Sequence, residues 1–227
     1  MNEQELSTIK ANIFSSFRDV LIPTNQMVVP PPSAIIYIDE QNLMETAKQL
    51  SFQIDYIKLR ELFNIFFDVK DCWIFTSTVS NELAKKYYMP GDRSRPDMSL
   101  TPNVKHTTWL VKNGFKLCTK PVKIFKDKNN EFQMKGNLDV DLAVHAMHYS
   151  KPASHVFLFT GDSDFVALVK HLQFANKKVT AISTIHSAFI PLGTELKDNV
   201  DNFIDLNDLR PYISRDIKYV PNHNLQN

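Results

Sequence analysis

The chain has 227 residues, a hydrophobic content of 43%, a charged content of 22% and a formal net charge of +1. These values are ordinary for a soluble globular protein, and the near-neutral charge argues neither for nor against a polyanionic partner. With only 5 glycines, the chain offers little material for a glycine-rich phosphate loop.

Cys72 and Cys118 each lie inside an apolar run, which favours free thiols in a reducing compartment over a disulfide. Stretches of about 20 apolar residues, the length needed to span a bilayer, do not occur. The N-terminal residues also lack the basic start and apolar core of a secretion signal. The sequence therefore predicts a cytoplasmic protein without a membrane partner.

Three regions follow one another along the chain. Apolar residues recur at helical spacing over residues 3–22, and a proline-rich stretch follows, so residues 1–33 are expected to form a helix and a stiff linker. A domain is expected over residues 34–214 and a tail over residues 215–227.

Within the domain, short apolar runs alternate with helical patterns. The expected strands are 34–38, 72–75, 115–122, 155–159, 178–182 and 203–206. The expected helices are 43–50, 57–66, 81–88, 102–112, 138–149, 165–176, 194–199 and a last turn that ends at 213. Residues 89–102 are expected to form an exposed loop, and residues 123–134 a hairpin or arm. Such alternation predicts a three-layer α/β/α fold with a mainly parallel central sheet.

Acidic residues collect where these strands end. Asp39 ends the first strand, Asp162 and Asp164 follow the strand at 155–159, and Asp139 opens the helix before it. In an open α/β sheet, ligands bind at the carboxyl ends of the strands. Each acid taken alone could equally be a helix cap or a dipole partner. Together, the crowded pair and its partners indicate a site for a cation.

Three segments, in order, resemble the motifs of the NYN domain family, a branch of the PIN-like nuclease superfamily. They are Ile36-Tyr37-Ile38-Asp39-Glu40-Gln41-Asn42-Leu43, Lys135-Gly136-Asn137-Leu138-Asp139-Val140-Asp141-Leu142 and Phe159-Thr160-Gly161-Asp162-Ser163-Asp164-Phe165. The closing stretch, Leu196 to Leu206, is also similar to that of the family. The resemblance covers residues 34 to about 214.

The resemblance implies a PIN-like fold and cleavage of RNA that depends on Mg²⁺ or Mn²⁺. Carried over by position, it implies that four carboxylates hold the metal, with Asn42 and Thr160 beside them. The four are Asp39, Asp139, Asp162 and Asp164. Asp39 and Asp162 are expected to be the most direct ligands, and water, rather than Thr160 or Ser163, is the expected nucleophile.

One departure concerns His145, where many family members carry another Asp. Asp141 could substitute from the neighbouring turn, but it lies two residues from Asp139 and the two do not share a helix face, so Asp139 is preferred. His145 is expected either to contact phosphate or water, or to pack beneath the site. Asn42 is expected either to orient a phosphate or a metal-bound water, or to be an ordinary polar residue at a helix start.

Lysines gather between Lys105 and Lys135, the segment that leads into the Lys-Gly motif. Lysine contacts to phosphate give salt-sensitive affinity for nucleic acid, whereas a lysine-rich hairpin can also be a solvated edge that resists aggregation. RNA is the expected partner, with DNA less favoured, and a homo-oligomer is compatible with the sequence. The expected phosphate contacts are Lys123, Lys126, Lys128, Lys135, Arg93 and Arg95.

The sequence thus predicts a metal-dependent ribonuclease. Two other readings stay open: a catalytically silent RNA-binding or regulatory module of the same fold, and a phosphatase of similar architecture. The second Asp that such a phosphatase needs, two residues after Asp39, is absent, because residue 41 is Gln.

Overall fold

The computed structural model describes residues 30–79, 104–126, 128, 132–184 and 194–215. The helix and linker expected before residue 30, the helix at 81–88, the loop at 89–102 and most of the tail lie outside these ranges. The expected division of the chain into three regions therefore stays a prediction.

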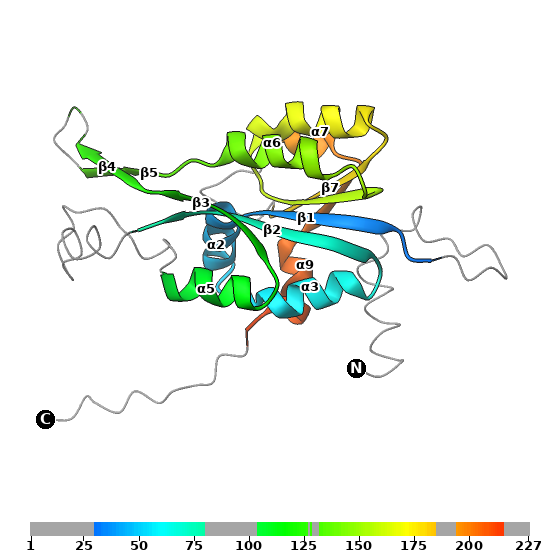
Figure 1. Cartoon of the computed structure of the whole chain (residues 1–227), viewed down its shortest axis with the longest axis horizontal. Coiled ribbons are helices and arrows are strands. Elements are labelled where there is room, and N and C mark those ends of the chain that lie inside the picture. The colour runs from blue at the N-terminus through cyan, green and yellow to red at the C-terminus, as the bar shows by residue number, and fades with distance from the viewer. Residues whose placement is uncertain (1–29, 80–103, 127, 129–131, 185–193, 216–227) are drawn as a thin grey trace, which may run out of the picture.

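Six strands form one sheet in the order β3-β2-β1-β6-β7-β8, and each neighbouring pair is parallel. Helices cover both faces, so the predicted three-layer α/β/α architecture is confirmed (Figure 1). The strands are β1 (Ser33–Asp39), β2 (Asp68–Thr78), β3 (Lys116–Pro121), β6 (His155–Phe159), β7 (Lys178–Ser183) and β8 (Asn202–Asp205).

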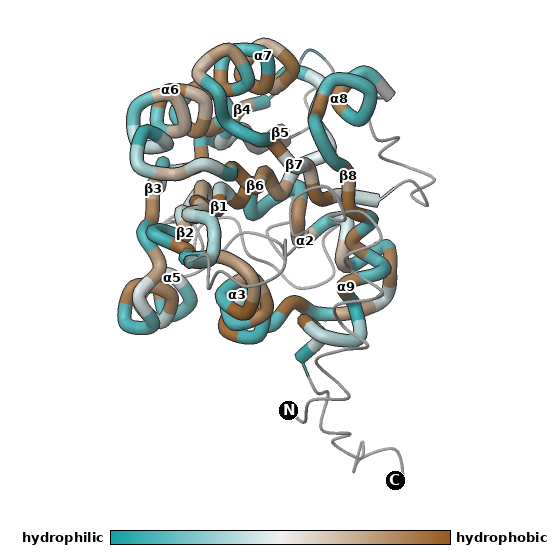
Figure 2. The backbone as a smooth tube through the Cα atoms, turned by 90° about the vertical axis from the view of Figure 1, so that its right-hand side faces the viewer, coloured by the Kyte–Doolittle hydropathy of each residue, from teal (hydrophilic) through white to brown (hydrophobic). Residues whose placement is uncertain are grey.

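The helices divide between the two faces of the sheet (Figure 2). On one face lie α2 (Glu40–Gln49), α3 (Tyr56–Asn64), α5 (Val104–Lys112) and α9 (Leu206–Ile213). On the other lie α6 (Asp139–Tyr149), α7 (Val166–Phe174) and α8 (Thr194–Asn199), with the short 3-10 turn η1 (Ser163–Phe165) before α7.

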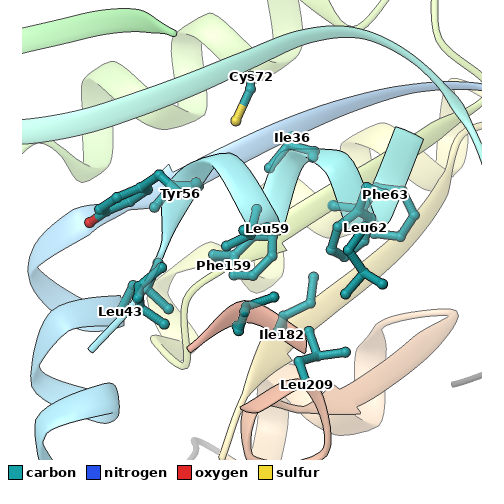
Figure 3. Packing of buried hydrophobic residues seen from close by; sticks show 14 of the residues in the cluster. Ile36, Leu43, Tyr56, Leu59, Leu62, Phe63, Cys72, Phe159, Ile182 and Leu209 are labelled. Carbon is teal, nitrogen blue, oxygen red and sulfur yellow. The ribbon is translucent and has the colours of Figure 1, made fainter. Parts of the chain in front are cut away.

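The central strands are hydrophobic on both sides because helices cover both faces. Residues 34–38 of β1 and 156–159 of β6 are completely inaccessible to solvent. Alternate residues face two separate cores: Ile36 packs with α3 and α9, whereas Tyr37 packs with α6 and α7. Figure 3 shows the first core, where Leu59 and Phe63 of α3 pack with Ile36 and Phe159.

Several strands have bounds that differ from the predicted ones, and the largest difference is in β2. β2 begins at Asp68 rather than at residue 72, because its first half alternates between partly buried and exposed residues and does not read as a buried strand. β8 ends at Asp205 rather than at Leu206. The Asp205 side chain accepts a hydrogen bond from the backbone N–H of Asn207 at 2.9 Å and so caps α9, which begins at Leu206.

The expected arm is a separate two-stranded hairpin, β4 (Lys123–Lys126) paired antiparallel with β5 (Phe132–Lys135). It continues from β3 and leads into α6, and it projects from the carboxyl end of the sheet (Figure 1). The arm therefore stands beside the edge of the sheet where the acidic residues gather.

Candidate metal centre

The site lies where the chain changes direction across the sheet. β1 and β6 are neighbours at the centre, with β2 and β3 on one side and β7 and β8 on the other. At such a switch point the connections leave the two central strands in opposite directions, which opens a crevice at their carboxyl ends. Asp39 ends β1 and Thr160 follows β6, so this fold places both residues at the crevice.

Asp39 is held at the first turn of α2. Its Oδ1 accepts a hydrogen bond from the backbone N–H of Asn42 at 3.3 Å, and its Oδ2 accepts one from the hydroxyl of Thr160 at 3.4 Å. Burial above all, together with the nearby carboxylates of Asp139 and Asp162, raises the pKa of this carboxyl from 3.8 to about 7, against the lowering effect of these hydrogen bonds. A cation bound beside Asp39 would relieve both causes.

The turn after β6 presents the next carboxylates. The amide oxygen of Asn42 accepts a hydrogen bond from the backbone N–H of Gly161 at 3.0 Å, and the buried Thr160 hydroxyl accepts one from the N–H of Asp162 at 3.3 Å. Asp162 then caps η1, accepting from the N–H of Asp164 at 2.9 Å. Asn42 and Thr160 therefore fix the turn that carries the two acids.

Asp139 begins α6 and is oriented by a residue just before the helix. Asn137 donates its side-chain N–H to Asp139 Oδ2 at 2.6 Å and accepts the backbone N–H of Asp139 at 2.8 Å. Partial burial raises the pKa of Asp139, and the carboxylates of Asp162 and Asp164 raise it too, against the lowering effect of Asn137.

Three of the predicted acids converge. One carboxylate oxygen from each of Asp139, Asp162 and Asp164 lies within 4.8 Å of the others. Asp139 and Asp162 border a cavity of about 330 Å³ that Asp39 and Asn42 also line. An all-carboxylate donor set suits a hard cation such as Mg²⁺ or Mn²⁺. The neighbouring carboxylates also contribute to the raised pKa values of Asp39 and Asp139, as expected where a site lacks positive charge. The residues present fit a divalent cation.

Asp141 and His145, which the sequence offered as further site residues, make contacts outside the acidic cluster. Asp141 forms an ion pair with Lys120 on β3. His145 stacks on Trp73, with ring centroids 5.0 Å apart, and also contacts Phe75 and Tyr149. Burial lowers the pKa of His145. The packing interpretation of His145 is the one that these contacts favour.

The predicted phosphate contacts are only partly described. Lys123, Lys126 and Lys128 are exposed along or beyond β4 of the arm. Arg93, Arg95 and the side chain of Lys135 lie outside the described residues. Ser163 begins η1 directly after Asp162.

Sequence reasoning missed Asn137, Ser77 and the role of Gly136. Ser77 and Gly136 line the cavity, and a Cβ atom at position 136 would lie 2.5 Å from the Cβ of Ser77. Asn137 could have been predicted from the sequence, because it lies inside the Lys-Gly motif two residues before Asp139. Ser77 could not, because a serine near a strand end is equally common without a site.

The model of the NYN domain family matches residues 33–207. The chain belongs to the NYN domain family. It is 30% identical over 108 residues to the low amplitude and bright protein LabA of Synechococcus elongatus, covering 47% of this chain and 56% of the relative. The chain thus spans about half the length of this curated relative.

The fold of this NYN protein also occurs in a solved structure. The crystal structure of a protein of unknown function from Vibrio parahaemolyticus matches with a TM-score of 0.57 and 23% identity, covering 80% of this chain and 96% of the other. The NYN family is nuclease-like, and the central parallel sheet is that of a PIN-like fold. Within the described residues, helices that are long and apolar enough to cross a membrane are absent.

Proposed function

We propose that this NYN protein is a metal-dependent ribonuclease that hydrolyses RNA phosphodiester bonds with an activated water. The observation that carries the proposal is the convergence of Asp139, Asp162 and Asp164 within 4.8 Å, beside Asp39 at the switch point of the sheet. Membership of a nuclease-like family supports it.

In this proposal, Asp39, Asp139, Asp162 and Asp164 hold Mg²⁺ or Mn²⁺. Bound divalent cations neutralise charge on a phosphate and lower the pKa of bound water. In the free protein, the Asp39 carboxyl keeps its proton up to about pH 7, so cation binding at neutral pH releases a proton from Asp39.

The surrounding side chains position these acids. Asn42 holds the Gly161 N–H, Thr160 bridges Asp39 and Asp162, and Asn137 orients the Asp139 carboxylate. A carboxylate fixed in this way binds a cation without first losing conformational freedom, which increases affinity. The exposed lysines of the arm would contact RNA phosphates beside the site.

The test is cleavage of labelled RNA and DNA in Mg²⁺, Mn²⁺ or EDTA. Asp39→Asn and Asp162→Asn should abolish cleavage and weaken Mn²⁺ binding, measured by calorimetry, while the fold and RNA binding persist. Asp208→Asn, at an exposed position on α9, is the matched control and should cleave normally.

Cleavage that resists EDTA, or full activity in both variants, would contradict the metal-carboxylate mechanism. A well-folded protein that binds RNA and Mn²⁺ but cleaves no substrate would instead favour the silent RNA-binding module.

A further inference from the structure

Outside the acidic cluster, one strip of surface combines stacked aromatic rings with lysines. We define the β3–α6 strip as Trp73 of β2, Lys116 and Lys120 of β3, and His145 and Tyr149 of α6. In a strand, side chains two residues apart share a face, so Lys116 and Lys120 lie on the same face of β3 as Cys118, which packs with Trp73 in the core under α6.

The rings of the strip form a compact cluster in which His145 and Tyr149 both lie against Trp73 and 5.4 Å from each other. The centroid of Trp73 lies 5.0 Å from that of His145 and 5.3 Å from that of Tyr149, at interplanar angles of 30° and 25°. The most exposed of the three is Tyr149, which is 42% exposed although it is large and aromatic. These contacts, together with the edge contact of His148 at 4.7 Å, hold the exposed ring rigid, and a rigid aromatic ring binds another flat ring at little entropic cost.

Both lysines are held in place by carboxylates. Lys116 lies 2.7 Å from Asp71, and its Nζ lies 5.3 Å from the centre of the Trp73 ring. Lys120 pairs with Asp141. The strip is therefore close to neutral, unlike the arm, and its recognition chemistry is dominated by the aromatic rings.

The strip is continuous with the candidate metal centre. Ser77, which lines the cavity, is opposite Lys120 in the register of β2 and β3. Asp139 and Tyr149 are the first and last residues of α6. They are ten helical steps apart, or about 15 Å, which matches about four nucleotides at the ~3.4 Å spacing of a stacked strand.

We propose that the β3–α6 strip binds the bases of single-stranded RNA next to the scissile position, with one base stacked on Tyr149. The proposal rests on the proposed function for its choice of nucleic acid. Stacking needs the open face of an unpaired base, which a duplex covers, so the strip selects single strands.

A near-neutral strip and a lysine-rich arm predict different salt dependence. Stacking on Tyr149 adds affinity without releasing counterions, so its removal lowers affinity by the same factor at every salt concentration. Loss of an arm lysine instead reduces the slope of log affinity against log salt by about 0.7 per phosphate contact on single strands.

The experiment measures fluorescence anisotropy of a labelled single-stranded RNA oligonucleotide in EDTA, with a duplex of the same sequence in parallel. Tyr149→Ala should weaken single-strand binding roughly 5- to 100-fold with an unchanged salt slope, and Tyr149→Phe should bind like the wild type. Phe174→Ala on the neighbouring helix α7, where the ring is 89% exposed, is the control and should have no effect.

A second measurement does not depend on the stability of the Tyr149→Ala variant. In a Trp109→Phe protein, Trp73 is the one remaining tryptophan of the two in the sequence, and its emission should change when single-stranded RNA binds but not when duplex binds. Wild-type affinity in Tyr149→Ala, equal affinity for duplex, or no RNA binding at all would overturn the proposal.

EDTA removes the divalent cation, so RNA binding to the strip is measured without metal-dependent cleavage. The strip and the ribonuclease activity can therefore be contradicted independently. A protein that stacks RNA on Tyr149 but never cleaves supports the strip and contradicts the ribonuclease. A protein that cleaves, yet binds RNA equally well with Tyr149→Ala, contradicts the strip alone.

Discussion

The side-chain oxygen of Asn42 accepts the backbone N–H of Gly161 at 3.0 Å and so joins the first turn of α2 to the turn after β6. These residues are 119 positions apart in the sequence. The bond connects the segment that ends in Asp39 with the segment that presents Asp162 and Asp164. The relative positions of the acids therefore depend on a neutral amide.

Asn42→Ala should disturb the centre before it disturbs the fold. It leaves the buried N–H of Gly161 without a partner, which costs about 1–3 kcal/mol of unfolding free energy, and it frees the turn that carries Asp162. We expect calorimetry to show weaker Mn²⁺ binding. We also expect urea denaturation to show a modest decrease in the unfolding free energy. Asn207→Ala, at an exposed position on α9, should change neither. Wild-type Mn²⁺ affinity in Asn42→Ala would show that the bond does not position the acids.

The raised pKa of Asp39 makes stability depend on pH when no metal is bound. Between its ordinary value of 3.8 and about 7, the folded protein keeps a proton on Asp39 that the unfolded chain has released. The unfolding free energy therefore falls as the pH rises through this window, by up to about 4 kcal/mol, and the loss is complete above pH 7.

Asp39→Asn removes that titration and keeps a side chain that can cap α2. In EDTA, the variant should be more stable than the wild type at pH 8, and the gap should close as the pH approaches 4. Thermal denaturation at a series of pH values checks this. Adding Mg²⁺ at pH 8 should stabilise the wild type more than the variant. A gap that is the same at every pH would contradict the assignment to Asp39.

Gly136 allows the close approach between the end of the arm and β2. Gly136→Ala places a Cβ 2.5 Å from the Cβ of Ser77, so one of the two segments must move at a cost of roughly 1–3 kcal/mol. The shift displaces the Asn137–Asp139 pair, and Mn²⁺ affinity should fall as well. Ser77→Gly removes the opposing side chain, so the double variant should recover both stability and Mn²⁺ affinity. If the double variant does not recover, the contact between residues 77 and 136 is not the reason that position 136 needs glycine.

The arm lysines should supply the salt-dependent part of RNA affinity. Lys123→Gln and Lys128→Gln should each weaken RNA binding and reduce the slope of log affinity against log salt by about 0.7. Lys170→Gln, at an exposed position on α7, is the control. Unchanged slopes in both arm variants would favour the alternative in which the lysines only protect the edge of the hairpin.

Local sequence patterns were sufficient to predict the fold and the family. The continuous apolar runs at β1 and β6 required a sheet covered on both faces, and the three motifs identified an NYN domain; both predictions are confirmed. The first half of β2 was not predicted, because a continuous apolar run indicates only a buried strand and this half contains exposed residues. The metal roles of the four acids remain predictions.

Within the site, the sequence identified candidate residues but did not show which of them lie together in the fold. Asp139 and Asp141 differ by two positions, and the helix turns one toward Asp162 and the other toward Lys120. His145 was expected either to contact phosphate or water or to pack beneath the site, and its stacking on Trp73 favours packing.

The sequence by itself determined which residues end the strands, because burial of apolar runs and the helical starts that follow them are local properties. It did not determine which of those residues meet. That depended on the order β3-β2-β1-β6-β7-β8, which places β1 beside β6 and brings Asn42 to Gly161. Contacts of this kind join distant segments, and only the packing of the whole sheet fixes their geometry.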